Sequence, residues 1–286
     1  MPKLILGTAT FGTGYGISNK GSYVASKDIF EIVSAAQTNG IDEFDTAPAY
    51  GFAEGYLGLS LNQEFSPKVS SKVSKDHCES AELILRSVKN TIRNTKVQKI
   101  SNLYLHDPEV LNGPKASEAI AGLKEALASG LVERIGLSVY TLDSLLRAKD
   151  LFPELSVFQV PENICDRRML NSKELMDLKC DDNVLIVRSI FLQGLLLMAL
   201  SEVPTKLNSA RKLILELSKL AKANQITPLD VCLAYGQAIS WASGIVVGAV
   251  NASQVIQIVE SRIKLEDSWL TKIDTASLEI LDPRRW

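Results

Sequence analysis

Short apolar runs alternate along this chain with longer segments whose apolar residues recur at helical spacing. The runs predict strands over residues 4–7, 41–45, 68–72, 102–106, 133–138, 156–160, 183–189 and 244–247. The segments between them predict helices over residues 26–39, 53–61, 79–94, 115–129, 141–150, 172–179, 208–223, 227–239 and 251–261.

This alternation is typical of repeated βα units and therefore of a parallel sheet. The seventh predicted strand is almost entirely apolar, as expected for a parallel strand that is buried on both faces. The glycines of GTGYG at 12–16 lack the GxGxxG spacing of a dinucleotide-binding doubly wound sheet. We therefore expect an α/β fold, an eight-stranded parallel (β/α)₈ TIM barrel, as a single domain over residues 1–286.

Composition excludes several classes of function. The 286 residues carry a formal net charge of −2, which implies no general attraction to nucleic acid or to an anionic membrane. The N-terminal apolar run is too short for a signal peptide, and no apolar stretch is long enough to span a bilayer. Four widely spaced cysteines and only two histidines favour reduced thiols and no metal site. We expect a cytoplasmic protein.

Four residues capable of proton chemistry follow one another at or just after predicted strand ends. Asp45, Lys72 and His106 end the second, third and fourth strands, and Tyr50 lies in the loop after Asp45. Each alone has an ordinary explanation: a structural aspartate, a surface lysine, a turn histidine or a packed tyrosine. Their joint occurrence in order favours a site, because the carboxyl ends of barrel strands line one mouth.

These side chains together make a proton donor. A neighbouring ammonium group lowers the pKa of a phenol, so Lys72 would activate Tyr50. A buried ammonium needs a carboxylate partner, which Asp45 would supply. His106 can orient a carbonyl oxygen and share its developing charge. Such a general acid over a carbonyl needs hydride from a cofactor.

Five segments resemble the aldo-keto reductase family, and the resemblance extends over nearly the whole chain. They are DTAPAYGFAE at 45–54, SK at 71–72, LYLH at 103–106, IGLS at 135–138 and FQVPEN at 158–163. The resemblance implies a (β/α)₈ barrel that reduces aldehydes or ketones without metal, using a nicotinamide cofactor that is usually NADPH. It also implies that Tyr50 is the general acid, that Lys72 and Asp45 set its pKa, and that His106 positions the substrate carbonyl.

The resemblance also assigns cofactor residues. Ser138 and Gln159 match positions that hold the nicotinamide carboxamide, although Val139 replaces the usual asparagine. Arg188 stands where many members have an aromatic residue, and it could instead meet an anionic substrate group. The remaining candidates lie in segments similar to the pyrophosphate loop and the adenosine loop: Ser189, Gln193, Gly194, Gly248, Asn251 and Gln254. NADP(H) is the expected cofactor, with NAD(H) as the alternative, because the adenosine loop has no basic residue.

The partner is expected to be a small carbonyl compound, polar or sugar-derived. Candidate substrate contacts are Phe11, Tyr15, Tyr140 and the C-terminal tail with Trp286. We expect a monomer or a weak homo-oligomer. Two other functions stay open: a nicotinamide-binding sensor or regulatory subunit with little turnover, and a lyase or dehydratase that holds the cofactor without net redox.

Overall fold

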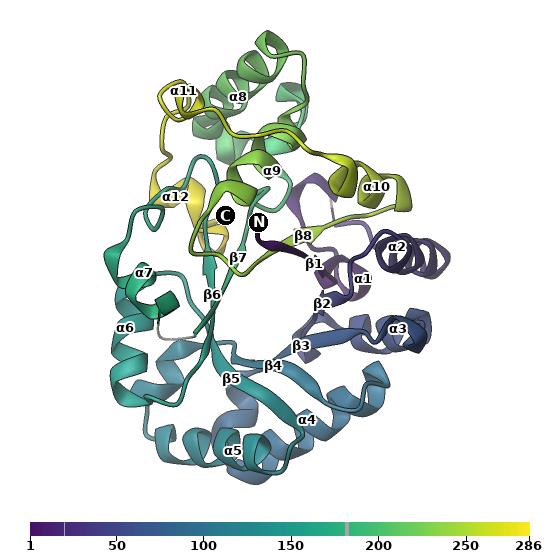
Figure 1. The fold of residues 1–286 in the computed structure, drawn as a ribbon, viewed down its shortest axis with the longest axis vertical. Helices are drawn as coiled ribbons and strands as arrows, with labels where there is room; N and C mark the ends of the chain where they lie inside the picture. Colours follow the sequence, from purple (N-terminus) through teal and green to yellow (C-terminus); the bar gives the residue numbers. More distant parts are fainter. Residues whose placement is uncertain (20, 181–182) are drawn as a thin grey trace.

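A closed barrel of eight parallel strands forms the centre of the protein. The structure is a computed structural model that describes residues 1–19, 21–180 and 183–286. Within them the strands pair in sequence order, and the last pairs with the first (Figure 1). They are β1 (Lys3–Gly7), β2 (Glu43–Asp45), β3 (Lys68–Val73), β4 (Ile100–Leu105), β5 (Val132–Ser138), β6 (Val157–Pro161), β7 (Val184–Arg188) and β8 (Gly244–Gly248). The predicted barrel is confirmed, with His106 directly after β4 rather than within it.

Helices surround this barrel, and each of the predicted helices is present. Those that follow the strands are α2 (Ser26–Thr38), α3 (Ala53–Ser60), α4 (Ala81–Thr95), α5 (Ala116–Ala128), α6 (Leu142–Leu151), α7 (Lys173–Cys180), α8 (Arg211–Ala223), α9 (Pro228–Ala238) and α10 (Ala252–Glu260). The sequence did not predict three short helices, α1 (Ala9–Gly12), α11 (Asp267–Leu270) and α12 (Leu278–Leu281). Every helix in the described part of the chain falls short of the length or apolarity needed to cross a bilayer.

Apolar side chains fill the barrel and the layer between strands and helices. Inside the barrel, Ile5, Tyr104, Val157 and Ile186 form one buried cluster. Outside it, the strands pack on the helices through residues such as Phe44, which is fully buried. Each large apolar side chain that becomes fully buried contributes roughly 1.5–3 kcal/mol to folding. The strands therefore form a rigid support for the polar residues at their carboxyl ends.

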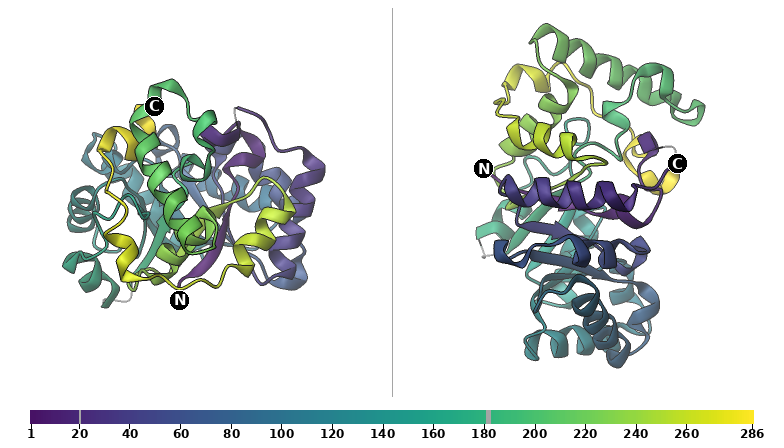
Figure 2. Two further views of the ribbon diagram at one scale, coloured as in Figure 1. Left: turned by 90° about the horizontal axis from the view of Figure 1, so that it is seen from above. Right: turned by 90° about the vertical axis from the view of Figure 1, so that its right-hand side faces the viewer.

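The two ends of the chain lie on opposite sides of the barrel. Figure 2 shows the N-terminus on one side and the C-terminus on the other. The tail after α10 carries α11, α12 and a 3-10 turn, η9 (Pro283–Arg285). Arg284 in this turn stacks on Tyr140, two residues beyond the end of β5. The tail therefore finishes at the carboxyl ends of the strands, where the polar residues gather.

Candidate active site

The predicted site residues gather at one rim of the barrel. Asp45, Ser138 and Arg188 are the last residues of β2, β5 and β7, and Lys72 is the penultimate residue of β3. His106 follows β4, and its backbone N–H donates to Val73 O at 3.0 Å. Because all eight strands are parallel, these ends meet on the same side of the barrel.

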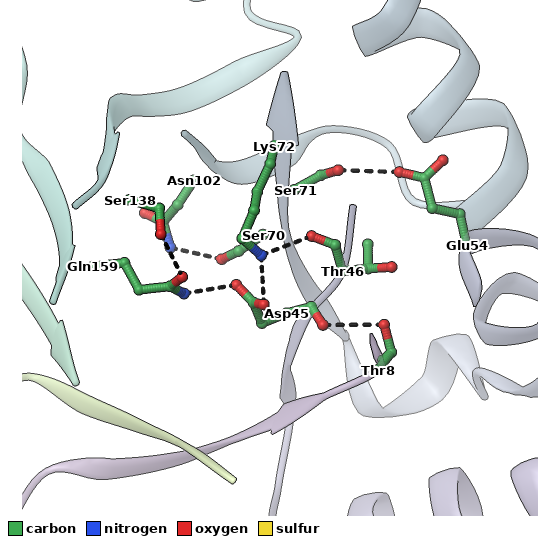
Figure 3. A network of polar contacts seen from close by, with 10 residues as sticks. All are labelled: Thr8, Asp45, Thr46, Glu54, Ser70, Ser71, Lys72, Asn102, Ser138 and Gln159. Atoms are coloured by element: carbon green, nitrogen blue, oxygen red, sulfur yellow. Dashed lines mark hydrogen bonds and ion pairs between the residues drawn. The ribbon is translucent and has the colours of Figure 1, made fainter. Parts of the chain in front are cut away.

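A buried ion pair lies at the centre of the rim. Lys72 Nζ is 2.6 Å from Asp45 Oδ1 and donates to the carbonyl oxygen of Thr46 at 3.0 Å. Gln159 Nε2 donates to Asp45 Oδ2 at 2.8 Å, and Ser138 Oγ donates to Gln159 Oε1 at 3.2 Å. Figure 3 shows this chain of contacts across the strands. Both oxygens of the carboxylate are thus used, and its position is fixed.

Lys72 stays protonated despite its burial. Lys72 is 2% exposed and Asp45 is 5% exposed. Burial disfavours the ammonium group, but the Asp45 carboxylate and the Tyr50 oxygen outweigh it, so the pKa of Lys72 lies above its ordinary value. The Lys72 ammonium group therefore lies charged next to the residues that line the open end of the barrel.

Tyr50 and His106 lie beside this ammonium group. Tyr50 ends the 3-10 turn η2 (Pro48–Tyr50), and the centre of its ring is 5.0 Å from Lys72 Nζ. The rings of Tyr50 and His106 meet edge to face, with centroids 6.4 Å apart. Burial, and then the Lys72 ammonium, lower the pKa of His106, which favours a neutral imidazole. The structure brings the four predicted catalytic residues together.

Two glycines allow the chain to place Tyr50. A Cβ atom on Gly12 would lie 1.9 Å from the carbonyl oxygen of Tyr50, closer than atoms can approach. Gly51 has a φ of 61°, and a Cβ atom there would lie 2.5 Å from the carbonyl oxygen of Gly12. Helix α1 and the loop of Tyr50 are therefore in backbone contact, which requires glycine at both positions.

A cavity of about 740 Å³ opens beside the ion pair. Such a volume is typical of a site for a drug-sized ligand or a cofactor. The cavity extends from the strand ends to the segments that precede α9 and end α10. Its lining includes these predicted residues: Tyr15, Asp45, Tyr50, Gln159, Arg188, Ser189, Gln193, Gly194, Gly248 and Gln254.

One wall of the cavity is a loop with an unusual backbone. Ser189, Leu192 and Gln193 have positive φ angles of 64°, 48° and 55°, and these are half of the described non-glycine residues with positive φ. Gly194 follows with a φ of 86°, and a Cβ atom there would lie 2.2 Å from Ser18 Oγ. The backbone N–H of Ile17 donates to Gln193 O at 3.1 Å. Backbone held in such conformations is concentrated at ligand sites.

Six predicted residues lie outside the lining of this cavity: Lys72 and His106, whose contacts are given above, and Phe11, Asn251, Ser138 and Tyr140. Phe11 is 1% exposed and packs in the core between β1, α2 and α3, so it supports the wall instead of facing a ligand. Asn251 is the N-cap of α10, where its side chain accepts from the N–H of Gln254. Ser138 contacts the site through Gln159. Tyr140 stacks on two arginines, Arg188 and Arg284.

Two parts of the site were not predicted from the sequence: the hydrogen bonds of Glu54 and the contribution of the start of α9 to the cavity. Glu54 is 3% exposed and accepts a hydrogen bond from Ser71 Oγ at 3.0 Å, which ties α3 to β3 (Figure 3). It also accepts a hydrogen bond from Thr91 Oγ1 at 2.8 Å, which ties α3 to α4. The start of α9 lines the far part of the cavity, where Thr227 and Asp230 form a capping box. The Thr-x-x-Asp spacing of Thr227 and Asp230 could have predicted this helix start from the sequence. No sequence pattern indicates which residues donate hydrogen bonds to Glu54.

The cavity fits a nicotinamide dinucleotide. Its volume is sufficient, and a Cβ atom on Gly248 would meet nothing within 4 Å, so the backbone there is open to a ligand. Gln159 lines the cavity together with Tyr50, and Ser138 supports Gln159 from behind through a hydrogen bond of 3.2 Å. The described residues include no group of three or more side chains placed to hold a metal ion.

Comparison with known proteins identifies the family. The sequence profile of the Aldo/keto reductase family matches residues 3–277. L-galactose dehydrogenase of Arabidopsis thaliana is 28% identical, over 97% of this chain and 92% of that protein. 6-dehydroglucose reductase of Novosphingobium aromaticivorans is 27% identical, over 47% of this chain and 49% of that protein.

Solved structures share the fold. A thermostable aldo-keto reductase in complex with the inhibitor epalrestat superposes with a TM-score of 0.73 at 22% identity, covering 95% of this chain and 93% of that one. The glycerol dehydrogenase of Gluconobacter oxydans gives a TM-score of 0.72 at 19% identity, covering 98% and 92%. With the family profile matched from the first strand to the C-terminal tail, the chain belongs to the aldo/keto reductase family and is an NAD(P)H-dependent oxidoreductase.

Proposed function

We propose that this protein reduces the carbonyl group of an aldehyde or ketone, with Tyr50 as the general acid. The observation that carries the proposal is the buried Lys72–Asp45 pair, whose ammonium group lies 5.0 Å from the centre of the Tyr50 ring. Tyr50 also lines the cavity, so its side chain is available to a bound substrate.

Each residue has a distinct part in the proton transfer. Tyr50 gives its phenolic proton to the carbonyl oxygen, and the Lys72 ammonium stabilises the phenolate that remains. Asp45 keeps Lys72 protonated, and Gln159 keeps Asp45 in place through a bond of 2.8 Å. Neutral His106 donates a hydrogen bond to the carbonyl oxygen and orients it toward Tyr50.

The cofactor supplies the hydride when it is bound. We assign Ser138 and Gln159 to its carboxamide, because they form a hydrogen-bonded pair beside Asp45. Ser189, Gln193 and Gly194 belong to the loop of left-handed backbone that lines the cavity, and we assign this loop to the pyrophosphate because such backbone conformations form anion-binding concavities. Gly248 and Gln254 face the adenosine part, and Arg188 lies at the nicotinamide end.

The lining of the cavity bears on the choice of cofactor. Glu202, Asp230 and Glu260 line it from the segments that follow β7 and β8, and Arg188 is the one basic residue among the described lining residues. The 2′-phosphate of NADP(H) would place further negative charge near these carboxylates. We therefore propose that NADH is accepted at least as well as NADPH, in contrast to the NADP(H) preference that the family resemblance implies.

The substrate we propose is a sugar-derived carbonyl compound. Two relatives are named for sugar substrates, L-galactose dehydrogenase and 6-dehydroglucose reductase. The cavity presents polar groups from Tyr15, Tyr50 and Arg188 near the reacting position. All four cysteines are free thiols, as suits a reducing compartment, and we propose a cytoplasmic enzyme that is a monomer or a weak homo-oligomer.

A two-part experiment tests the proposal. The first part titrates NADH and NADPH into the protein by calorimetry, and the second follows nicotinamide absorbance with a panel of aldehydes, ketones and aldoses. Cofactor binding with turnover supports the reductase. Binding without turnover of any carbonyl compound supports the sensor or regulatory subunit instead, and product formation without an absorbance change supports the lyase. If neither nucleotide binds, the proposed function fails.

A further inference from the structure

Arg188 is a cation at the catalytic end of the cavity. It ends β7 and lines the cavity together with Tyr15 and Tyr50. Its Nη1 donates to Ser189 Oγ at 3.1 Å, and its Nη2 donates to the carbonyl oxygen of Val139 at 3.0 Å. Both acceptors are neutral, and the described residues place no carboxylate in an ion pair with Arg188.

The protein satisfies this guanidinium only in part. A guanidinium has five N–H groups, and the two hydrogen bonds use two of them. Its Nε is buried and has no hydrogen-bond partner among the described residues. An unsatisfied buried donor costs about 1–3 kcal/mol, and more when it belongs to a charged group. The described residues therefore leave part of the hydrogen-bonding capacity of Arg188 unused.

The position of Arg188 is nevertheless fixed. Its guanidinium lies 4.1 Å from the centre of the Tyr140 ring. Arg284 of the C-terminal tail lies 3.7 Å from the same ring and is itself bound by Asp282 at 2.8 and 2.6 Å. The charge of Arg284 is thus balanced, whereas the described residues supply no counter-ion for Arg188. The C-terminal tail therefore packs against the Tyr140 ring, and this ring in turn packs against Arg188.

Among the described residues at this end of the cavity, the positive charge of Arg188 is left uncompensated. Lys72 and Asp45 neutralise each other at 2.6 Å. The three other carboxylates of the lining, Glu202, Asp230 and Glu260, belong to the segments after β7 and β8 and not to the strand ends. Counted over the described residues, the part of the cavity next to Tyr50 therefore carries a net positive charge. A planar guanidinium in this situation binds a carboxylate through paired hydrogen bonds.

We propose that the substrate carries a carboxylate that binds Arg188 while its carbonyl group lies at Tyr50. The inference rests on the proposed reductase function and narrows its substrate class to aldehydes or ketones that bear an acid group, such as oxidised sugars. The pyrophosphate of the cofactor is a second anion that could bind Arg188, and the experiment separates the two.

The test compares acids with uncharged analogues of similar shape. The probes are 3- and 4-carboxybenzaldehyde and their methyl esters, together with D-glucuronate and D-glucose. We expect kcat/KM of the wild type to favour the charged member of at least one pair tenfold or more. Arg188→Met should reduce this preference at least tenfold, because kcat/KM for the acids should fall far more than kcat/KM for the esters, which have no negative charge for the guanidinium to bind. Arg188→Lys should keep part of the preference.

A control variant and three contrary outcomes distinguish the possible roles of Arg188. Arg86→Met removes an exposed positive charge on α4 and should leave the acid preference unchanged. A wild type that reduces acids and esters equally well overturns the inference and leaves the reductase function intact. Equal loss for acids and esters in Arg188→Met, with weaker NADH binding by calorimetry, would assign Arg188 to the cofactor and overturn it too. If the wild type reduces no carbonyl compound, both proposals fail.

Discussion

Lys72 Nζ and Asp45 Oδ1 lie 2.6 Å apart in a buried ion pair that joins β3 to β2. Both side chains are almost fully buried, so each charge depends on the other for compensation. Removing one partner of a buried pair typically destabilises a protein by about 3–5 kcal/mol, because the other charge stays buried without compensation. The pair is thus structural, in addition to the part we propose for it in proton transfer.

We expect Asp45→Asn to lower the free energy of unfolding by about 3–5 kcal/mol, because Lys72 loses its counter-ion. Turnover should fall as well, since Lys72 would tend to lose its proton. Urea denaturation measures the first effect and steady-state kinetics the second. The matched control is Glu43→Gln on the same strand, where Glu43 pairs with the exposed Lys3 at 3.0 Å. A surface pair contributes about 0–1 kcal/mol, so equal losses in the two variants would contradict the prediction.

Tyr50→Phe removes the phenolic oxygen and keeps the ring that meets His106 edge to face. We expect kcat to fall by about 10²–10⁴, the usual contribution of a general acid. Binding of NADH measured by calorimetry should change less than twofold, because the ring still fills its place. Tyr56→Phe on α3 is the control and should keep full activity. Turnover of Tyr50→Phe at the wild-type rate would remove Tyr50 from the mechanism.

Much of the fold could be predicted from the sequence, because the patterns that specify its strands and helices are local. Apolar runs between amphipathic helices specify parallel strands, and parallel strands place their carboxyl ends on one rim. Asp45, Lys72 and His106 could therefore be assigned to one site from their places in the strands. The partnership of Lys72 with Asp45 followed from charge alone, since a buried ammonium needs a carboxylate.

What the sequence did not predict depends on contacts between distant segments. Arg284 reaches Tyr140 only because the tail returns to the mouth of the barrel. Phe11 was expected at the substrate site, but an aromatic residue after a strand can face either the mouth or the core, and packing against α2 and α3 decides for the core. Asn251 resembles a ligand residue in sequence, yet its side chain is used to cap α10.

Gly12→Ala tests whether the contact between α1 and the Tyr50 loop positions the general acid. The new Cβ atom would lie 1.9 Å from the carbonyl oxygen of Tyr50, so this backbone must move. We expect a loss of about 1–3 kcal/mol in stability from overpacking. We also expect a fall in kcat of up to about 10²-fold, because a displacement of 1 Å is enough for that.

Gly55→Ala provides a control of opposite sign. Gly55 lies within α3, and a Cβ atom there would meet nothing within 4 Å. Alanine in a helix interior is more stable than glycine by about 0.5–1 kcal/mol, so this variant should gain stability and keep full activity. Thermal unfolding and steady-state kinetics on both variants check the pair of predictions. A Gly12→Ala variant that behaves like Gly55→Ala would show that the contact has no role in placing Tyr50.

His106 gives the site a pH dependence whose sign follows from its surroundings. Burial and the Lys72 ammonium lower the pKa of His106 below its ordinary value of 6.5. Below pH 6.5 the unfolded chain therefore binds a proton at this residue more readily than the native protein does. The free energy of unfolding then falls as the pH decreases from 6.5 to the native pKa of His106.

Replacing the imidazole should remove this contribution. We expect the stability of the wild type to fall more steeply than that of His106→Gln as the pH decreases below 6.5, as measured by urea denaturation at a series of pH values. The chain has only two histidines, so NMR can follow the imidazole of His106 directly once His77→Gln has assigned it. A native pKa above 6.5 would contradict the direction expected from burial and Lys72, and a native pKa above the assay pH would mean that His106 is mostly charged in the resting site. It would then donate to the carbonyl oxygen as an imidazolium group, and the neutral donor assigned to it here would be wrong.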